Sequence, residues 1–163
     1  MGKRHSAAAA AAVAAIGLLI GRDLARFAVA EESMAPALLP GDYLITRRLR
    51  QPPRRGEVVV FTHPARAGFH LIKRIVAVGG ESVEVADGQV IVNGRPLAEP
   101  WANGPTLGVG RWQLAPEEAF VLGDARSLSA DDGRTLGPLA VSAIEWRAIF
   151  RYWPPTRLGR PAV

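Results

Sequence analysis

Short runs of apolar and β-branched residues recur along most of the chain and predict a β-rich fold. Gly- and Pro-containing turns separate the runs, and no long amphipathic helical pattern lies between them. Short strands divided by such turns favour antiparallel sheets, so the predicted fold class is mainly β. The clearest predicted strands are 43–46, 58–61, 71–78, 119–122 and 144–153.

A β-hairpin is the best defined local structure in this pattern. Polar and apolar residues alternate over 82–85, Asp87-Gly88 is a strong turn signal, and the apolar residues 90–92 form the returning strand. Asn93-Gly94 marks a further turn. The Gly- and Pro-rich segment 100–110 is predicted to be an exposed excursion from the sheet.

The first 26 residues follow a different pattern, and three interpretations of them are open. Lys3, Arg4 and His5 precede an uncharged, Ala-rich stretch at 6–21. This stretch is short for a membrane span, so it could be an uncleaved anchor, a signal peptide cleaved at Ala28-Val29-Ala30, or a soluble helix. Charged residues between the stretch and that tripeptide weaken the cleaved-signal interpretation. An anchor helix is therefore favoured, with its basic end in the cytoplasm and helix continuing toward Arg26.

The chain of 163 residues has room for one domain with a substantial core. We expect residues 1–26 to form a cytoplasmic tip and anchor helix, residues 27–155 a β-rich domain, and residues 156–163 a C-terminal tail.

Composition excludes several kinds of chemistry. The chain has no Cys, so disulfides, zinc–thiolate sites and cysteine nucleophiles are excluded. Its three histidines lack the spacing of metal ligands, and neither a metal nor a cofactor is predicted. The net charge is +5, which fits a solvated basic surface or contact with anionic lipid. No basic motif interleaved with aromatic residues is present, so nucleic-acid binding is not predicted.

Lys73 is the most unusual residue of the pattern, because it interrupts an apolar strand. A buried ammonium is costly, so Lys73 either faces water on an edge strand or loses its proton and can serve as a general base. Strand alternation places Lys73 on one face with Leu71 and Ile75, whereas Arg74 on the other face must reach water or a carboxylate. His70 also lies on that other face and is expected at the surface.

Several segments, taken in order, resemble the bacterial type I signal peptidases, a family of serine–lysine endopeptidases. The segments that carry the resemblance are Ser33-Met34-Ala35-Pro36, Leu39-Pro40-Gly41-Asp42, Arg55-Gly56-Glu57-Val58-Val59-Val60-Phe61, Ile72-Lys73-Arg74-Ile75-Val76, Gly123-Asp124-Ala125-Arg126 with Ser129 and Asp132-Gly133-Arg134, and Arg147-Ala148-Ile149-Phe150.

The resemblance implies an enzyme that removes signal peptides from exported preproteins after small residues in an Ala-x-Ala pattern. It also implies a signal-peptidase-like catalytic domain outside the cytoplasm, held at the cell membrane by a single span. The expected partners are preproteins and membrane lipid, and the expected state is a monomer without a cofactor.

Carried over residue by residue, the resemblance makes Ser33 the nucleophile and Lys73 the general base. Ser129 would orient the lysine amine, and the Ser33 N–H would bind the oxyanion. Four charged residues match a structural set near the site: Asp124, Arg126, Asp132 and Arg134. Four apolar residues fall where the family binds substrate: Val29, Met34, Leu38 and Ile72.

The chain departs from the family pattern at a few positions. Glu31 stands where some members have Ser or Gly, and we expect Glu31 and Glu32 to point outward, away from Lys73. Ala125 and Leu128 replace two asparagines. One extra residue leaves open whether Asp131 or Asp132 fills the family position.

Two alternative functions stay open. One is a maturation protease of the same family with a single partner, such as the nickel superoxide dismutase maturation type. The other is a non-catalytic, membrane-tethered binding domain that has kept the fold. A self-cleaving repressor would need a DNA-binding module, which residues 1–26 are too short to form.

Overall fold

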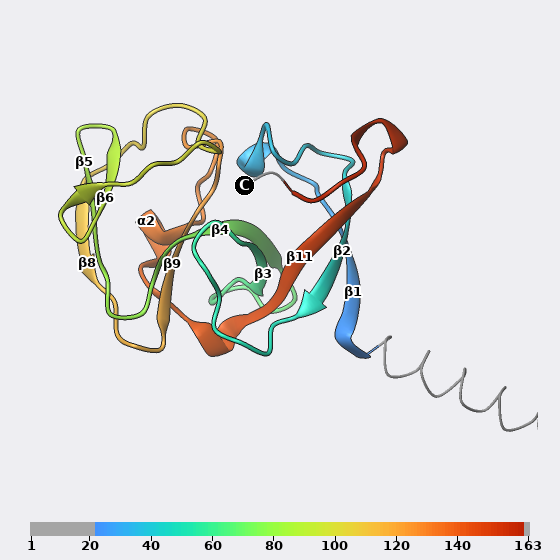
Figure 1. Cartoon of the computed structure of the whole chain (residues 1–163), viewed down its shortest axis with the longest axis horizontal. Coiled ribbons are helices and arrows are strands. Elements are labelled where there is room, and N and C mark those ends of the chain that lie inside the picture. The colour runs from blue at the N-terminus through green and yellow to red at the C-terminus, as the bar shows by residue number, and fades with distance from the viewer. Residues whose placement is uncertain (1–21, 162–163) are drawn as a thin grey trace, which may run out of the picture.

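The computed structural model describes residues 22–161, which form two antiparallel β-sheets (Figure 1). The larger sheet has the strand order β1-β2-β11-β3-β4-β9-β10, and the smaller sheet has the order β7-β6-β5-β8. The prediction of a mainly β, antiparallel fold is confirmed.

The strands of the larger sheet are β1 (Leu24–Ala28), β2 (Tyr43–Arg48), β3 (Val58–Thr62), β4 (His70–Val78), β9 (Glu118–Leu122), β10 (Leu139–Ala140) and β11 (Ile144–Trp153). Those of the smaller sheet are β5 (Ser82–Ala86), β6 (Gln89–Val92), β7 (Arg95–Pro96) and β8 (Gly110–Gln113). The helical turns are η1 (Glu32–Met34), α2 (Gly133–Leu136), η2 (Val141–Ala143) and η3 (Pro155–Arg157).

The continuous apolar runs of the sequence became the central strands of the larger sheet. Strand β3 lies between β11 and β4, and its residues Val58–Phe61 are all buried. Strand β4 lies between β3 and β9, so it is not an edge strand. Strands covered on both faces need apolar side chains at successive positions, which explains why these runs do not alternate.

Strand β1 corrects one expectation about the N-terminal segment. Residues 24–28 pair with residues 43–47 of β2, so the expectation of helix as far as Arg26 is wrong from Leu24 onward. Pairing with β2 gives this backbone inter-strand hydrogen bonds in place of helical ones. The rest of the predicted anchor, residues 1–21, lies outside the described residues. Within residues 22–161, no helix has the length and apolar character needed to cross a membrane.

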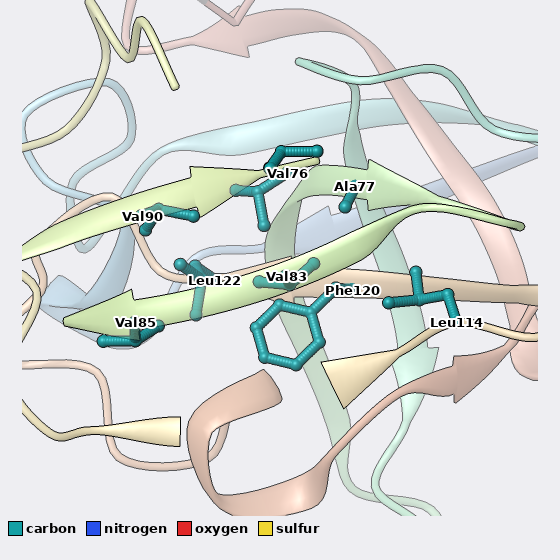
Figure 2. Close-up of a cluster of buried hydrophobic side chains, with 9 residues drawn as sticks. Val76, Ala77, Val83, Val85, Val90, Leu114, Phe120 and Leu122 are labelled. Carbon is teal, nitrogen blue, oxygen red and sulfur yellow. The ribbon is translucent and has the colours of Figure 1, made fainter. Parts of the chain in front are cut away.

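The smaller sheet is an insertion between β4 and β9, and an apolar core joins it to the larger sheet. Figure 2 shows this core, in which Val83 and Val85 of β5 lie beside Phe120 and Leu122 of β9. The β5–β6 hairpin turns at Asp87-Gly88, where both residues have positive φ values of 51° and 78°. This is the conformation that a two-residue hairpin turn with an Asp-Gly sequence adopts.

The segment 100–110 is mostly exposed, as predicted, but two of its residues reach inward. Thr106 is buried and Trp101 is half-buried, and both contact buried arginines. The Arg126 guanidinium donates to Thr106 Oγ1, and the Arg74 guanidinium lies 5.0 Å from the centre of the Trp101 ring. The excursion therefore covers part of the charged interior.

The larger sheet curves so that its edge strand β1 approaches β4. Three strands separate β1 from β4 in the sheet order, yet the Phe27 ring lies 5.4 Å from the His70 ring. This curvature brings the segment after β1, which includes η1, against the first half of β4. The candidate site lies there.

Candidate active site

Ser33 lies in the short turn η1, which two backbone hydrogen bonds and an apolar anchor hold in place. The Ala35 N–H donates to Glu32 O at 2.9 Å, and the Leu38 N–H donates to Met34 O at 2.8 Å. Met34 and Leu38 are buried in an apolar cluster with Val29, Leu44, Val58 and Ala148. Ser33 itself is buried, with 8% of its surface exposed.

Lys73 is buried in β4, with only 2% of its surface exposed. Leu71 and Ile75, its neighbours on the same strand face, belong to the core cluster of the larger sheet. Burial lowers the pKa of the Lys73 amine. The carboxylates of Asp132, Glu31 and Asp131 oppose this shift and Arg134 adds to it, but burial is the largest effect. Lys73 therefore does not occupy the solvated edge that its sequence also allowed.

A cavity of about 100 Å³ brings Ser33 and Lys73 together. Residues 28–31, 33 and 34 line one side of it, and residues 69–73 line the other. Three of the four residues expected to bind substrate line it: Val29, Met34 and Ile72. Leu38 is not on the wall, because it is fully buried in the apolar cluster that also holds Met34.

Ser129 packs against Gly123, beside the backbone of Ser33. The Ser129 hydroxyl donates to Asp132 Oδ2 at 2.7 Å, which leaves its oxygen free to accept a hydrogen bond. A β-carbon on Gly123 would overlap the Ser129 side chain and lie 2.6 Å from the Ser33 carbonyl oxygen. The Ala125 N–H donates to that same carbonyl at 3.1 Å. Only a glycine at position 123 leaves room for both the Ser129 side chain and the Ser33 carbonyl oxygen.

Asp132, and not Asp131, is built into the site. Its carboxylate is fully buried and accepts hydrogen bonds from Ser129, from the Gly123 N–H and from the Arg134 guanidinium. Burial by itself favours the protonated acid, but the bonds from Arg134 and Ser129 outweigh it and lower the pKa of Asp132. Asp131 is half-buried, 3.8 Å from His63 Nε2.

Arg74 and Asp124 form a fully buried ion pair next to the site. The Arg74 Nε and Nη2 donate to the two oxygens of Asp124 at 2.8 Å and 2.7 Å, and Nη1 donates to Gly56 O at 2.8 Å. Arg74 therefore reaches a carboxylate, one of the two outcomes that the strand pattern allowed. Burial raises the pKa of Asp124, and the nearby Arg74, Arg126 and Lys73 charges oppose this shift.

Arg126 has partners that sequence reasoning missed. Its guanidinium donates to Gly123 O at 3.0 Å, to Thr106 Oγ1 and to both carboxylate oxygens of Glu99. The sequence did contain one signal for these contacts. Glu99 and Trp101 stand close together in a segment that otherwise consists mostly of small residues and Gly or Pro. Their partners lie far away in sequence, so the pairing itself was not readable.

Glu31 is exposed, as expected. It also lines the cavity, and its charge acts to raise the pKa of Lys73. Glu32 is exposed and is not among the residues that line the cavity. His70 is exposed, as expected, but it too lines the cavity.

Residues 3–153 match the sequence model of the family described as signal peptidase, peptidase S26. The chain belongs to this signal peptidase family. The resemblance seen in the sequence is thereby confirmed, and the protein is a serine-type endopeptidase of the family that removes signal peptides. Preproteins are accordingly its class of substrate.

Relatives of known name support the assignment. Signal peptidase I of Leptolyngbya laminosa is 36% identical over 143 residues, covering 80% of this chain and 70% of that protein. Probable signal peptidase I-1 of a Synechocystis species is 34% identical over 155 residues, covering 84% and 78%. Probable thylakoidal processing peptidase 2 of Arabidopsis thaliana is 36% identical over 138 residues, which is 78% of this chain but 37% of that longer protein.

The fold is shared with a solved signal peptidase structure. The crystal structure of a signal peptidase I from Enterococcus faecalis matches with a TM-score of 0.50 and 24% identity. The match covers 58% of this chain and 94% of that chain. The β-rich domain described above is therefore a signal-peptidase-like fold.

Proposed function

We propose that this signal peptidase cleaves preproteins by means of a Ser33–Lys73 dyad. The observation that carries the proposal is a lysine with 2% of its surface exposed that lines the same small cavity as a buried serine. Burial favours the neutral amine, and a neutral amine can accept the proton of a serine hydroxyl at ordinary pH.

The reaction follows from the groups on the cavity walls. Neutral Lys73 accepts the proton of the Ser33 hydroxyl while Ser33 Oγ attacks the scissile carbonyl carbon. The protonated amine then gives its proton to the leaving nitrogen, and the C–N bond breaks to leave an acyl-enzyme. Lys73 next removes a proton from water, which attacks the ester carbon. The C–O bond to Ser33 Oγ then breaks, and Lys73 returns the proton to that oxygen, which regenerates the free hydroxyl and the neutral amine.

The Ser33 N–H is the proposed oxyanion donor. Among the described residues, the backbone hydrogen bonds outside regular elements include none donated by this N–H. An unpaired donor beside the nucleophile can stabilise the charge that develops on the carbonyl oxygen. Ser129, held by Asp132, is the proposed acceptor that orients the Lys73 amine. The ion-paired residues Arg74 and Asp124 support the strands beneath.

Substrate choice is proposed to follow from the apolar walls of the cavity. Val29, Met34 and Ile72 line it, and apolar walls close around a small side chain favour methyl-sized groups over bulky ones. Leu38 contributes from behind the wall by fixing Met34. This supports cleavage after small residues in an Ala-x-Ala pattern.

We further propose that a single-pass anchor in the segment before β1 holds the catalytic domain at the outer face of the cell membrane. Basic Lys3 and Arg4 followed by the uncharged stretch 6–21 support this orientation. Lipid is then a neighbour of the domain. The domain is proposed to act as a monomer.

A narrower role, the maturation of one partner, is the second candidate. Glu31 on the cavity wall favours it, because a fixed charge beside the nucleophile restricts which sequences fit.

The test is incubation of the full chain in detergent micelles with a panel of preproteins that carry Ala-x-Ala sites. Ser33→Ala and Lys73→Ala should each lower cleavage by about a thousandfold or more, since each removes half of the dyad. The exposed Ser127→Ala serves as the matched control and should cleave like the wild type. Cleavage is measured by gel and by mass spectrometry of the new N-terminus.

Each outcome of this test is informative. Cleavage of many preproteins selects the general signal peptidase, and cleavage of one selects the maturation role. Cleavage retained in Lys73→Ala would contradict the dyad.

A further inference from the structure

Glu31 has a carboxylate that the fold does not use. It is the residue that precedes the first turn of η1, yet its side chain makes no capping hydrogen bond there. Within the part of the chain that the structure describes, no ion pair involves it. The side chain is exposed, and the backbone at this position is extended.

The place of this carboxylate is the wall of the catalytic cavity. Glu31 stands two residues before Ser33 on one wall, and Lys73 is on the facing wall. The Glu31 charge raises the pKa of Lys73, which is consistent with a short separation. A peptide whose scissile bond reaches Ser33 must therefore pass close to Glu31.

Glu31 is the only acidic residue among the described residues that line the cavity. Among the described residues that line it, the ionisable acids and bases are Glu31, His70 and Lys73. The proposed mechanism uses Lys73 as the neutral amine, which adds no positive charge to balance the Glu31 carboxylate. Asp132, which is paired with Arg134, and Asp131 also raise the pKa of Lys73, but neither of them lines the cavity.

We propose that Glu31 is a specificity-determining residue, which selects preproteins with a cationic side chain close to the small residues at the cut. This inference rests on the proposed function and adds a charge preference to the size preference. A Lys or Arg side chain in the bound peptide can pair with the Glu31 carboxylate at the mouth of the cavity. An acidic side chain at the same place is repelled by it.

The experiment measures kcat/KM for peptides with an Ala-x-Ala site. Lys, Gln and Glu are placed in turn at each position around the cut, and the full chain in micelles is the enzyme. We expect wild type to prefer Lys over Glu at one position by about fivefold, the scale of a partly exposed ion pair. Glu31→Gln should abolish this preference and Glu31→Lys should reverse it. The preference should also weaken as salt is added.

Glu32→Gln is the matched control. Glu32 has the same charge, is adjacent in sequence and is exposed, but it does not line the cavity. Its variant should keep the wild-type preference. Equal loss of preference in Glu31→Gln and Glu32→Gln would assign the effect to the general field of the surface and overturn the inference.

The remaining outcomes separate this inference from the function on which it rests. Cleavage by wild type without any preference for charge overturns the role of Glu31 and leaves the peptidase intact. A charge preference that persists in Glu31→Gln also overturns the role of Glu31 and leaves the peptidase function intact. Failure of wild type to cut any peptide or preprotein overturns both.

Discussion

At the scale of single residues, the site depends on the burial of one amine. Lys73 lies between Leu71 and Ile75 in a central strand, and burial outweighs the nearby carboxylates in setting its pKa. The folded state therefore binds a proton at this position less readily than the unfolded chain, whose lysine titrates near 10.5. Burial of Lys73 thus costs stability below that pH, and the cost disappears as the pH rises toward 10.5.

The same lowered pKa predicts how activity depends on pH. The rate should rise with pH as Lys73 loses its proton and should reach a plateau below 10.5, the value of an unperturbed lysine. The measurement is kcat/KM for one neutral peptide from about pH 6 to about pH 11. A Glu31→Gln variant should shift the rise to lower pH, because Glu31 raises the pKa of Lys73. A rate that still climbs at 10.5 would contradict a buried base.

At the scale of elements, the C-terminal segment holds the loop that follows the nucleophile. Arg157 donates to both oxygens of the buried Asp42 at 2.9 Å and to Pro36 O at 3.0 Å. Arg151 of β11 donates to Ala37 O at 2.7 Å. The Gly41 N–H and the Asp42 carbonyl pair in turn with Val29 on the cavity wall. Two arginines from the end of the chain therefore fix both the nucleophile loop and the substrate wall.

Removal of Arg157 should loosen this loop. Arg157→Ala should lower the free energy of unfolding by about 1–3 kcal/mol, since Asp42 loses part of its charge compensation. It should also reduce kcat/KM. Urea unfolding and peptide cleavage are the measurements, and Arg160→Ala in the same segment is the control, because Arg160 makes no ion pair among the described residues. An Arg157→Ala protein as stable and active as Arg160→Ala would exclude this role for the segment.

At the scale of the whole molecule, the smaller sheet supports the site through a shared core. Phe120 of β9 packs in the core between the sheets, with its ring 4.7 Å from the Trp112 ring of β8. The Phe120 ring also packs against Gly133, so closely that a β-carbon on Gly133 would lie 2.7 Å from the ring. Gly133 begins α2, directly after Asp132. The core between the sheets thus backs the turn that holds the Asp132 carboxylate.

Truncation of Phe120 tests this support. Phe120→Ala should lower the free energy of unfolding by about 3–5 kcal/mol, the usual cost of emptying a buried phenylalanine site. Val109→Ala is the matched control, because Val109 is 89% exposed and its loss should change stability by less than about 0.5 kcal/mol. Urea denaturation of both variants decides the matter. Similar urea midpoints for the two variants would contradict a stabilising role for the Phe120 core.

Pattern alone determined the central strands, the hairpin and one candidate residue of the site, Lys73. Apolar runs had to become buried strands because their side chains leave water together, and β3, β4, β9 and β11 lie where those runs predicted. Lys73 was visible because one charge in such a run must be either exposed or neutral. Ser33 was recognisable through its resemblance to family segments, and the family assignment is confirmed.

Only the tertiary structure decided which of the open possibilities holds. The strand order places β4 between β3 and β9, and Lys73 of this central strand is buried. Sheet curvature brought Glu31 to the cavity wall, and long-range pairing joined Arg157 to Asp42 and Arg126 to Glu99. Local pattern records which side chains avoid water, but the partner of a charge depends on which distant segments the fold places beside it.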